Sequence, residues 1–320
     1  MVSVVIPAYN ASRFIRKAVV SIQNQTLNNF ELIVINDGST DNTREIVTEL
    51  AATDPRIRVI DGAHKGISAA LNLGIEQAVH PWIAIMHADD VALPTRLERQ
   101  FQAAQENPRV VVWGCYLYHV DSEERILALS KTGPTSEADF RRARSEARGV
   151  MVAHPSAFLK KEIWEKAGRY DGRFDGTEDM ELFDRMAEFG PVVAIPEPLM
   201  LYRIHSTSVT MNRFMKMRQF GRYVRARQRA RLAGGPLPTF EEFSLQQRQA
   251  PFHSRLRRYL DDLSQLHYRN AGLAHAERRR VSCLLHFGLS TLLNPAYALK
   301  RVCNQLFSPR PKINPPAQCI

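Results

Sequence analysis

Short apolar runs alternate with longer amphipathic segments along the first 90 residues. Four runs rich in β-branched side chains predict strands over residues 2–6, 30–36, 56–60 and 82–86. The segments between them repeat their apolar positions with helical spacing, at about residues 11–25, 40–53 and 66–79. Strands that alternate with helices in this way predict an α/β fold, with a Rossmann-like, mostly parallel sheet flanked by helices.

The next hundred residues keep the mixed pattern. A helix is expected from Pro94 to about residue 106, followed by a hairpin of residues 110–120 and 124–131. Further helices are predicted over 135–148, 160–167 and 177–189, and further strands over 154–159, 192–195 and 199–204. From residue 211 the strands stop, and three helical segments rich in Arg predict a basic extension that ends near residue 307. Residues 308–320 contain four prolines and are predicted to be disordered.

The positive charge of the chain is confined to this extension. The formal net charge is +10, yet residues 1–210 carry 23 Lys and Arg against 28 Asp and Glu, while residues 211–320 carry 20 against 5. A basic extension on a neutral-to-acidic body favours an anionic partner, either membrane lipid or nucleic acid. The arginines are not interleaved with stacking aromatics, which argues against single-stranded nucleic acid.

We expect the protein to contact the surface of a membrane and not to cross the bilayer. No run approaches the roughly 18 to 20 apolar residues that a spanning helix needs. Met1 leads directly into VSVVI without a secretory signal, and the four cysteines are scattered, so we expect a cytoplasmic protein. The 13-residue segment VSCLLHFGLSTLL follows Arg278–Arg280, which suits a helix lying on the inner face of the membrane. A helix that packs on the catalytic body or on a dimer partner fits this pattern equally well.

Polar residues follow each of the first four predicted strands. They are Pro7, Ala8, Tyr9 and Asn10, then Asp37, then Asp61, and finally His87, Asp89 and Asp90. Ligands of an open parallel sheet bind beyond the carboxyl ends of its strands. The chain has no glycine-rich phosphate loop of the dinucleotide or P-loop type. Carboxylates can instead hold Mg²⁺ or Mn²⁺, which neutralises a diphosphate. A solvated turn is the alternative for Asp89–Asp90, but Asp37 at a neighbouring strand end favours metal and diphosphate binding.

Seven segments in order resemble one enzyme family. VSVVIPAYN, ELIVINDGSTDNT, HKGISAALNLGI and WIAIMHADD resemble the nucleotide-binding half of family 2 glycosyltransferases with the GT-A fold. HPSAFLKKEIWEKAGRYD, GTEDMELFDRM and LYRIHSTSVT resemble its acceptor half. The resemblance implies a catalytic domain over residues 1–210, divided into 1–107 and 108–210. It also implies inverting transfer of a sugar from a nucleotide-diphospho-sugar, with UDP-sugars first, to a hydroxyl of a glycan or lipid-linked saccharide, assisted by Mn²⁺ or Mg²⁺.

The resemblance also assigns roles by position. Pro7, Ala8, Tyr9, Asn10 and Asp37 would hold the nucleoside, Asp89 the ribose and the metal, and Asp90 and His205 the metal. Asp179, beside Glu178, would deprotonate the acceptor, and His87 and His154 would line the acceptor side. Where many members carry an Arg this chain has Leu71, so Lys65 is expected to take over a diphosphate contact. His87 replaces the usual first acid of the DxD-type motif, and its imidazole can still bind Mn²⁺ or form a hydrogen bond with the ribose.

Other interpretations of single residues stay open at this level. Tyr9 can be a core residue, and His205 a structural histidine. Glu178 and Asp179 can be ordinary acids at the start of a helix, where the helix dipole is expected to keep them ionised. A non-catalytic nucleotide-sugar binding protein is the second functional class. A sugar-phosphate nucleotidyltransferase is the third, although PAYNAS is not the basic, glycine-rich loop that such an enzyme needs.

Overall fold

The computed structural model describes residues 1–204 and 213–307. The chain divides into two compact units, one of residues 1–120 and 128–203, the other of residues 121–127 and the chain after 203. The first unit holds the sheet and every described residue of the candidate site. The predicted tail, residues 308–320, lies outside the described residues, as does His205.

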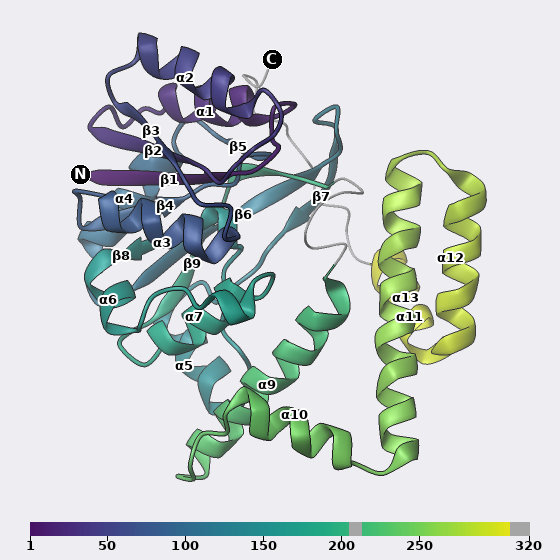
Figure 1. Cartoon of the computed structure of the whole chain (residues 1–320). Coiled ribbons are helices and arrows are strands. Elements are labelled where there is room, and N and C mark those ends of the chain that lie inside the picture. Colours follow the sequence, from purple (N-terminus) through teal and green to yellow (C-terminus); the bar gives the residue numbers. More distant parts are fainter. Residues whose placement is uncertain (205–212, 308–320) are drawn as a thin grey trace. The chain divides into compact units, whose positions relative to one another are not determined.

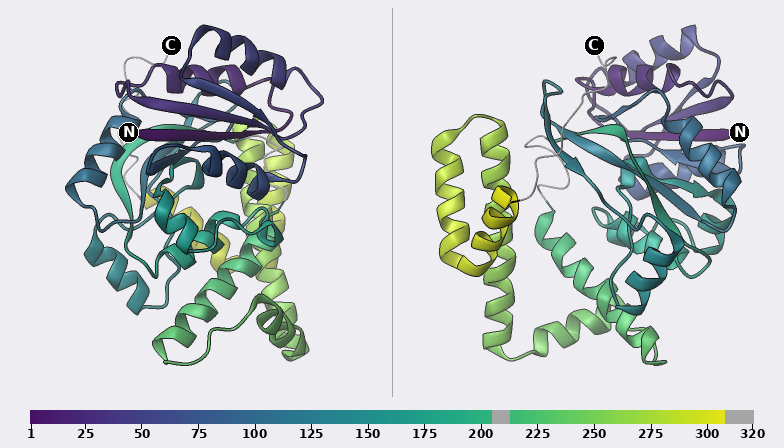
Figure 2. Two further views of the ribbon diagram at one scale, coloured as in Figure 1. Left: turned by 60° about the vertical axis from the view of Figure 1, so that its left-hand side comes forward. Right: turned by 180° about the vertical axis from the view of Figure 1, so that it is seen from behind.

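Nine strands of the described chain form one sheet (Figures 1 and 2). In spatial order they are β3 (Ile57–Asp61), β2 (Phe30–Asn36), β1 (Val2–Ala8), β4 (Trp82–Ile85), β8 (Phe158–Lys160), β6 (Val112–Val120), β9 (Val192–Arg203) and β5 (Val91–Ala92), with β7 (Ile126–Ser130) paired to β6. The first four strands of the chain, β1 to β4, pair with one another in parallel, as predicted. Their carboxyl ends therefore lie along one edge of the sheet. Strands β8, β5 and β7 add the antiparallel or hairpin pairings of the second half.

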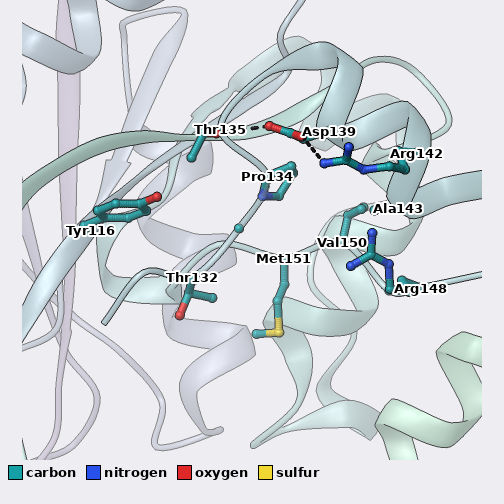
Figure 3. A pocket seen from close by; sticks show the side chains of 12 residues that line it. Tyr116, Thr132, Pro134, Thr135, Asp139, Arg142, Ala143, Arg148, Val150 and Met151 are labelled. Atoms are coloured by element: carbon teal, nitrogen blue, oxygen red, sulfur yellow. Dashed lines mark hydrogen bonds and ion pairs between the residues drawn. The ribbon is translucent and has the colours of Figure 1, made fainter. Parts of the chain in front are cut away.

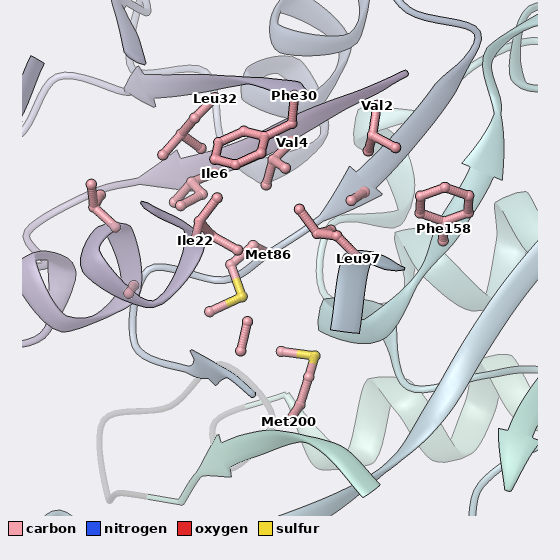
Figure 4. Packing of buried hydrophobic residues seen from close by; sticks show 14 of the residues in the cluster. Val2, Val4, Ile6, Ile22, Phe30, Leu32, Met86, Leu97, Phe158 and Met200 are labelled. Carbon is pink, nitrogen blue, oxygen red and sulfur yellow. The ribbon is translucent and has the colours of Figure 1, made fainter. Parts of the chain in front are cut away.

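Helices bury both faces of this sheet. One face packs against α1 (Ile15–Gln23), α2 (Thr43–Thr53) and α4 (Arg96–Glu106), and the other against α3 (Ile67–Gln77), α5 (Glu137–Ser145), α6 (Lys161–Lys166) and α7 (Glu178–Met186). Strand β1 is mostly apolar because both of its faces are buried. Val2, Val4 and Ile6 enter the first core (Figure 4), and Val5 enters the second. Polar side chains are therefore left for the strand ends.

The second half of the sheet differs from its prediction in three places. Residues 192–195 and 199–204 form one strand, β9, because register shifts along β6 between Cys115 and Tyr118 accommodate the prolines between them. Residues 154–159 are a short 3-10 turn, His154–Ser156, followed by β8, because Pro155 fixes its φ and Ser156 Oγ donates to the Ala153 carbonyl (2.7 Å). Strand β5 was not predicted, since two residues carry no periodicity.

The helical unit has five helices among its described residues, where the sequence predicted three segments. They are α9 (Phe214–Leu232), α10 (Phe240–Gln249), α11 (Phe252–Ala276), α12 (Arg280–Leu293) and α13 (Pro295–Phe307). Part of the basic charge is internal to this unit, because Arg218 and Arg222 of α9 both pair with Asp262 of α11 (2.8 Å each). None of the described helices combines the length and the apolar character needed to cross a bilayer.

Candidate active site

The loops after β1 and β2 are fastened to each other by hydrogen bonds. Asn10 Oδ1 accepts from the backbone N–H of Thr40 (2.8 Å). The backbone N–H of Ala11 donates to Thr43 Oγ1 (2.8 Å), and that of Ser12 to Asp41 Oδ2 (3.1 Å). Because backbone and short side chains make these contacts, the mouth of the site on the nucleotide-binding half is held rigidly, with Pro7 and Ala8 at the end of β1 beneath it.

Asp37 organises the next loop. Its carboxylate is 5% exposed and accepts from the backbone N–H groups of Lys65 (3.2 Å) and Gly66 (2.9 Å). Gly66 has φ +91° and no room for a side chain, since a Cβ there would lie 2.3 Å from Asp175 Oδ2. The side chain of Lys65 is exposed. Asp37 therefore fixes the backbone that leads into α3 and keeps lone pairs free for a ligand.

Tyr9 is 50% exposed, so it is not a core residue. Its ring lies 4.6 Å from that of His64, centroid to centroid, with the two planes tilted by 39°. His64 Nδ1 lies 3.0 Å from the Asp37 carbonyl oxygen, which fixes the imidazole. The pair places an open aromatic surface beside the buried carboxylate of Asp37.

Asp90 is the deepest acid of the site. It is 1% exposed, and its Oδ1 accepts from the backbone N–H of Arg203 (2.8 Å), while Arg203 Nε donates to the Asp89 carbonyl (2.9 Å). The pairing of β5 with β9 brings Arg203 here. Asp90 Oδ2 is buried and has no hydrogen-bond partner among the described residues. Burial, and then the neighbouring Asp89 carboxylate, raise the pKa of Asp90 well above its usual value.

His87 stands between the acids and a chain of buried polar groups. Its Nδ1 lies 4.0 Å from Asp90 Oδ2, and its Nε2 lies 3.2 Å from Nδ1 of His154. The other ring nitrogen of His154 lies 2.9 Å from the hydroxyl of Tyr170. Burial lowers the pKa of His87 to about 4 and that of His154 to about 3, so both rings are neutral at physiological pH. Ligand atoms of His87, Asp89 and Asp90 lie within 4.8 Å of one another.

Glu178 and Asp179 begin helix α7. Glu178 is 5% exposed; its Oε2 accepts from the N–H of Gly176, and its Oε1 lies 3.8 Å from His154 Nδ1. Burial raises the pKa of Glu178 to about 7, where the helix dipole was expected to keep it low. Burial also raises the pKa of Asp179, an effect that the N–H of Met180 (2.8 Å) and the nearby His87 oppose. Desolvation thus outweighs the helix dipole at this position.

The structure brings most predicted residues into two neighbouring groups at the carboxyl edge of the sheet, one around Asp37 and one around His87. It also reveals supporting residues that pattern analysis missed. Asn72 makes two hydrogen bonds with the backbone of Tyr170. Its Nδ2 donates to the carbonyl (2.9 Å), and its Oδ1 accepts from the N–H (3.0 Å). Asp175 caps the start of α3 through Ser68. Leu71 is fully buried in the core, which explains why it makes no polar contact.

A pocket of 440 Å³ lies elsewhere in the same unit (Figure 3). Residues 132–135, α5, the segment 148–151 and Tyr116 line it, and Arg142 and Arg148 give it a basic side. It contains none of the predicted site residues. We therefore locate the candidate active site at the sheet edge from the chemistry of its side chains and not from this pocket.

Comparison with known proteins gives one consistent result. Residues 3–167 match the model of glycosyl transferase family 2. The chain is 32% identical to the glycosyltransferase GlyG of Streptococcus pneumoniae over 67% of its own length and 74% of GlyG, and 30% identical to the uncharacterized glycosyltransferase EpsJ of Bacillus subtilis over 66% of its own length and 63% of EpsJ. It is 26% identical to the chondroitin synthase of Pasteurella multocida over 59% of its own length and 19% of that protein.

Solved structures agree on the fold. A mannosyltransferase from Pyrobaculum calidifontis, solved with GDP-Man and Mn²⁺, superposes with a TM-score of 0.57 at 20% identity over 96% of this chain and 87% of the other. S. aureus TarS, solved with UDP, gives a TM-score of 0.55 at 14% identity over 93% and 91%. The motifs at the strand ends, the sheet they occupy and the family match over residues 3–167 lead to one conclusion: the chain belongs to glycosyl transferase family 2 and has the GT-A fold.

Proposed function

We propose that this glycosyltransferase moves a sugar from a nucleotide-diphospho-sugar to an acceptor hydroxyl in a single displacement with inversion. The observation that carries the proposal is the placement of two acids of different character beside one imidazole. Asp90 presents a buried oxygen without a partner, and Asp179 lies near enough to His87 for each to affect the other's pKa. One acid can then serve the leaving diphosphate and the other the attacking hydroxyl.

The nucleoside belongs at the rigid mouth of the site. The exposed ring of Tyr9 would stack on the base, and Asp37 would accept a hydrogen bond from it. Lys65 would reach the diphosphate. Among structural neighbours, TarS is solved with UDP and with UDP-GlcNAc, and the Pyrobaculum enzyme with GDP-Man, so uridine donors are the first to test.

The residues present fit a divalent cation. Asp90 Oδ2 is a buried hard oxygen that has no hydrogen-bond partner in the described part of the chain, and Asp89 and His87 bring further ligand atoms within 4.8 Å. These three residues would hold Mn²⁺ or Mg²⁺; His205, also predicted as a ligand, lies outside the described residues. When bound, the ion would neutralise the charge that develops on the nucleoside diphosphate as it leaves.

Asp179 is the proposed general base. Burial raises its pKa, which makes the carboxylate a better proton acceptor than a solvated aspartate. Glu178, with a pKa of about 7, would carry a proton for part of the time near neutral pH, which lessens the repulsion between the two acids. The acceptor is proposed to be a glycan or lipid-linked saccharide, approaching over the half formed by residues 108–210, with residues 1–107 holding the donor.

The test is transfer by the wild type and by Asp179→Asn, with UDP-sugars and Mn²⁺. Loss of the base should lower the turnover about 10²- to 10⁴-fold while UDP binding is retained. Asp139→Asn is the matched control, because Asp139 is also an acid in the first turn of a helix but is only half-buried and lies outside the candidate site. Full activity in Asp179→Asn would refute the assignment. Release of UDP identifies transfer, whereas a nucleotidyltransferase would release pyrophosphate.

We also propose that the helical unit, residues 211–307, binds an anionic membrane surface through α12. Four apolar side chains on one face of this helix are 60 to 83% exposed: Val281, Leu284, Leu285 and Leu292. The opposite face packs on α11, where Ser264 Oγ donates to the Ser290 carbonyl (2.9 Å). Arg278–Arg280 precede the stripe, and exposed Lys300 and Arg301 follow on α13. An apolar stripe flanked by cations suits an interfacial helix on anionic lipid.

Sedimentation with vesicles tests this second proposal. The protein should pellet with vesicles containing phosphatidylserine at low salt, and less at high salt or with neutral lipid. The pair Leu284→Glu and Leu285→Glu should abolish pelleting. Leu245→Glu is the control, because Leu245 is an exposed leucine of α10. A wild-type protein that stays in the supernatant, or that pellets equally after the double substitution, contradicts the proposal.

A further inference from the structure

We propose that His87 is itself a ligand of the cation, through Nδ1, and that His154 and Tyr170 are positioning residues that fix its orientation and tautomer. The nitrogen ligand would shift the preference of the site from Mg²⁺ toward Mn²⁺. This inference rests on the proposed function, since it concerns the same cation. It goes further by assigning the ligand atom of His87, the side chains that orient this imidazole, and a metal selectivity that follows from a nitrogen ligand.

The geometry leaves one role for each ring nitrogen of His87. Nε2 is occupied, because it lies 3.2 Å from Nδ1 of His154. Nδ1 faces Asp90, 4.0 Å from the carboxylate oxygen that is buried and has no hydrogen-bond partner among the described residues. A separation of 4.0 Å is too long for a hydrogen bond, so both atoms remain available as ligands of a cation.

The chain behind His87 can supply the required tautomer. A neutral imidazole that binds a cation through one nitrogen carries its proton on the other, and that N–H needs an acceptor. His87 Nε2–H would donate to His154 Nδ1, and His154 Nε2–H would donate to the Tyr170 hydroxyl oxygen 2.9 Å away. In this order each imidazole donates once and accepts once, and the Nδ1 lone pair of His87 would point at Asp90.

The fold holds His154 and Tyr170, the two side chains behind His87, in place. His154 is 6% exposed and belongs to a 3-10 turn that Pro155 stiffens. Tyr170 is 4% exposed, and both hydrogen-bonding groups of its backbone are held by Asn72 of α3. The imidazole at position 87 is therefore oriented by three elements distant in sequence.

Selectivity follows from ligand chemistry. Oxygen ligands suit Mg²⁺, which dehydrates reluctantly and tolerates little distortion, whereas Mn²⁺ also accepts imidazole nitrogen. Replacing His87 by Asp would give the site a third carboxylate. The wild type should then prefer Mn²⁺ over Mg²⁺ by a larger ratio than His87→Asp.

Pulsed electron paramagnetic resonance of bound Mn²⁺ tests the ligand directly, with no need for turnover. Protein with Mn²⁺ and UDP should show a directly bound ¹⁴N coupling, and His87→Asp should bind Mn²⁺ without it. The ratio of Mg²⁺ to Mn²⁺ dissociation constants, measured by competition, should fall about tenfold or more in His87→Asp. His253→Asn, at a position outside the site in α11, is the control and should change neither.

The positioning role needs a pair of variants at one position. His154→Leu removes the acceptor for His87 Nε2–H and should weaken Mn²⁺ binding about 10- to 100-fold, the range for lost supporting hydrogen bonds. His154→Asn keeps an oxygen near the place of Nδ1 and should restore most of the affinity. Tyr170→Phe should give a smaller loss.

The outcomes separate this inference from the proposed function. Bound Mn²⁺ without nitrogen coupling in the wild type would overturn the inference, yet metal-dependent transfer that Asp90→Asn abolishes would leave the proposed function standing. Equal Mn²⁺ affinity in His154→Leu and His154→Asn would overturn the role of His154. Failure to bind Mn²⁺ in the presence of UDP or GDP would overturn the inference as a whole.

Discussion

Two groups of carboxylates occupy the same edge of one sheet and are built in opposite ways. Around β1–β3 the acids are well satisfied: although burial raises it, the pKa of Asp41 falls to about 2 because Thr43 and Ser12 donate to its carboxylate. Hydrogen bonds from Arg44 and Asn36 likewise lower the pKa of Asp61. Around β4 and α7, burial raises the pKa values of Asp90, Glu178 and Asp179 instead.

The difference in pKa separates acids that stabilise the loops of the site from acids that we propose to bind a ligand. A carboxylate that already accepts several N–H or O–H groups stabilises the fold through those hydrogen bonds. A buried carboxylate with an empty oxygen raises the free energy of the protein until a cation or proton arrives. The first group therefore fixes loops, and the second is the group that we propose for cation binding and proton transfer.

The largest effect is expected at Asp90. Asp90→Asn removes the buried oxygen that carries the charge, so Mn²⁺ affinity should fall more than about 100-fold. The metal-free variant should nevertheless melt at a higher temperature than the wild type at pH 8, because burial raises the pKa of Asp90 in the folded protein and this costs stability at a pH above its usual value. Titration calorimetry and thermal unfolding in EDTA measure the two effects. Unchanged Mn²⁺ affinity would remove Asp90 from the list of ligands.

Glu178, an acid of the second group, should make the free energy of unfolding depend on pH. Its pKa is about 7 in the folded protein against 4.5 ordinarily, so the folded state binds this proton more tightly. Its contribution to stability is present below pH 4.5 and is lost as the pH rises through 7. Glu178→Gln should therefore gain stability relative to the wild type between pH 5 and pH 8, by at most about 3 kcal/mol.

Thermal or urea unfolding of metal-free protein at the two pH values measures this gain. Asp175, Asp179 and His154 face Glu178 and are present in both proteins, so their own titration largely cancels. A constant difference in the free energy of unfolding across this range would show that Glu178 is ionised throughout.

A smaller change of opposite sign is expected at Asp37. Asp37→Asn turns an amide toward a backbone N–H of the loop before α3, at Lys65 or Gly66, so the protein should lose about 1 to 3 kcal/mol of stability. Asp61→Asn is the control, because its pair with Arg44 is half exposed and should cost less than about 1 kcal/mol. If Asp37→Asn were as stable as the wild type, the contrast between the two groups would fail.

The sequence alone determined the catalytic unit to a large extent. Strands buried on both faces need continuous apolar runs, and ligands meet the sheet beyond its strand ends, so the first four strands and the polar residues after them were readable. Tyr9, Asp37, Asp89 and Asp90 stood out because they follow predicted strands, whereas the role expected for Asp179 came from the family resemblance. The helical character of the basic extension followed from its periodicity in the same way.

Only the tertiary structure decided how these residues are charged and connected. Arg203 reaches Asp90 because the two-residue strand β5 pairs with β9, a contact across more than a hundred residues that no local pattern encodes. His154 contacts His87 because a 3-10 turn places it there. Tyr170 in turn contacts His154, and Asn72 holds the backbone of Tyr170. Burial then sets the pKa values, and burial is a property of the packed fold, whereas a sequence specifies only which groups can titrate.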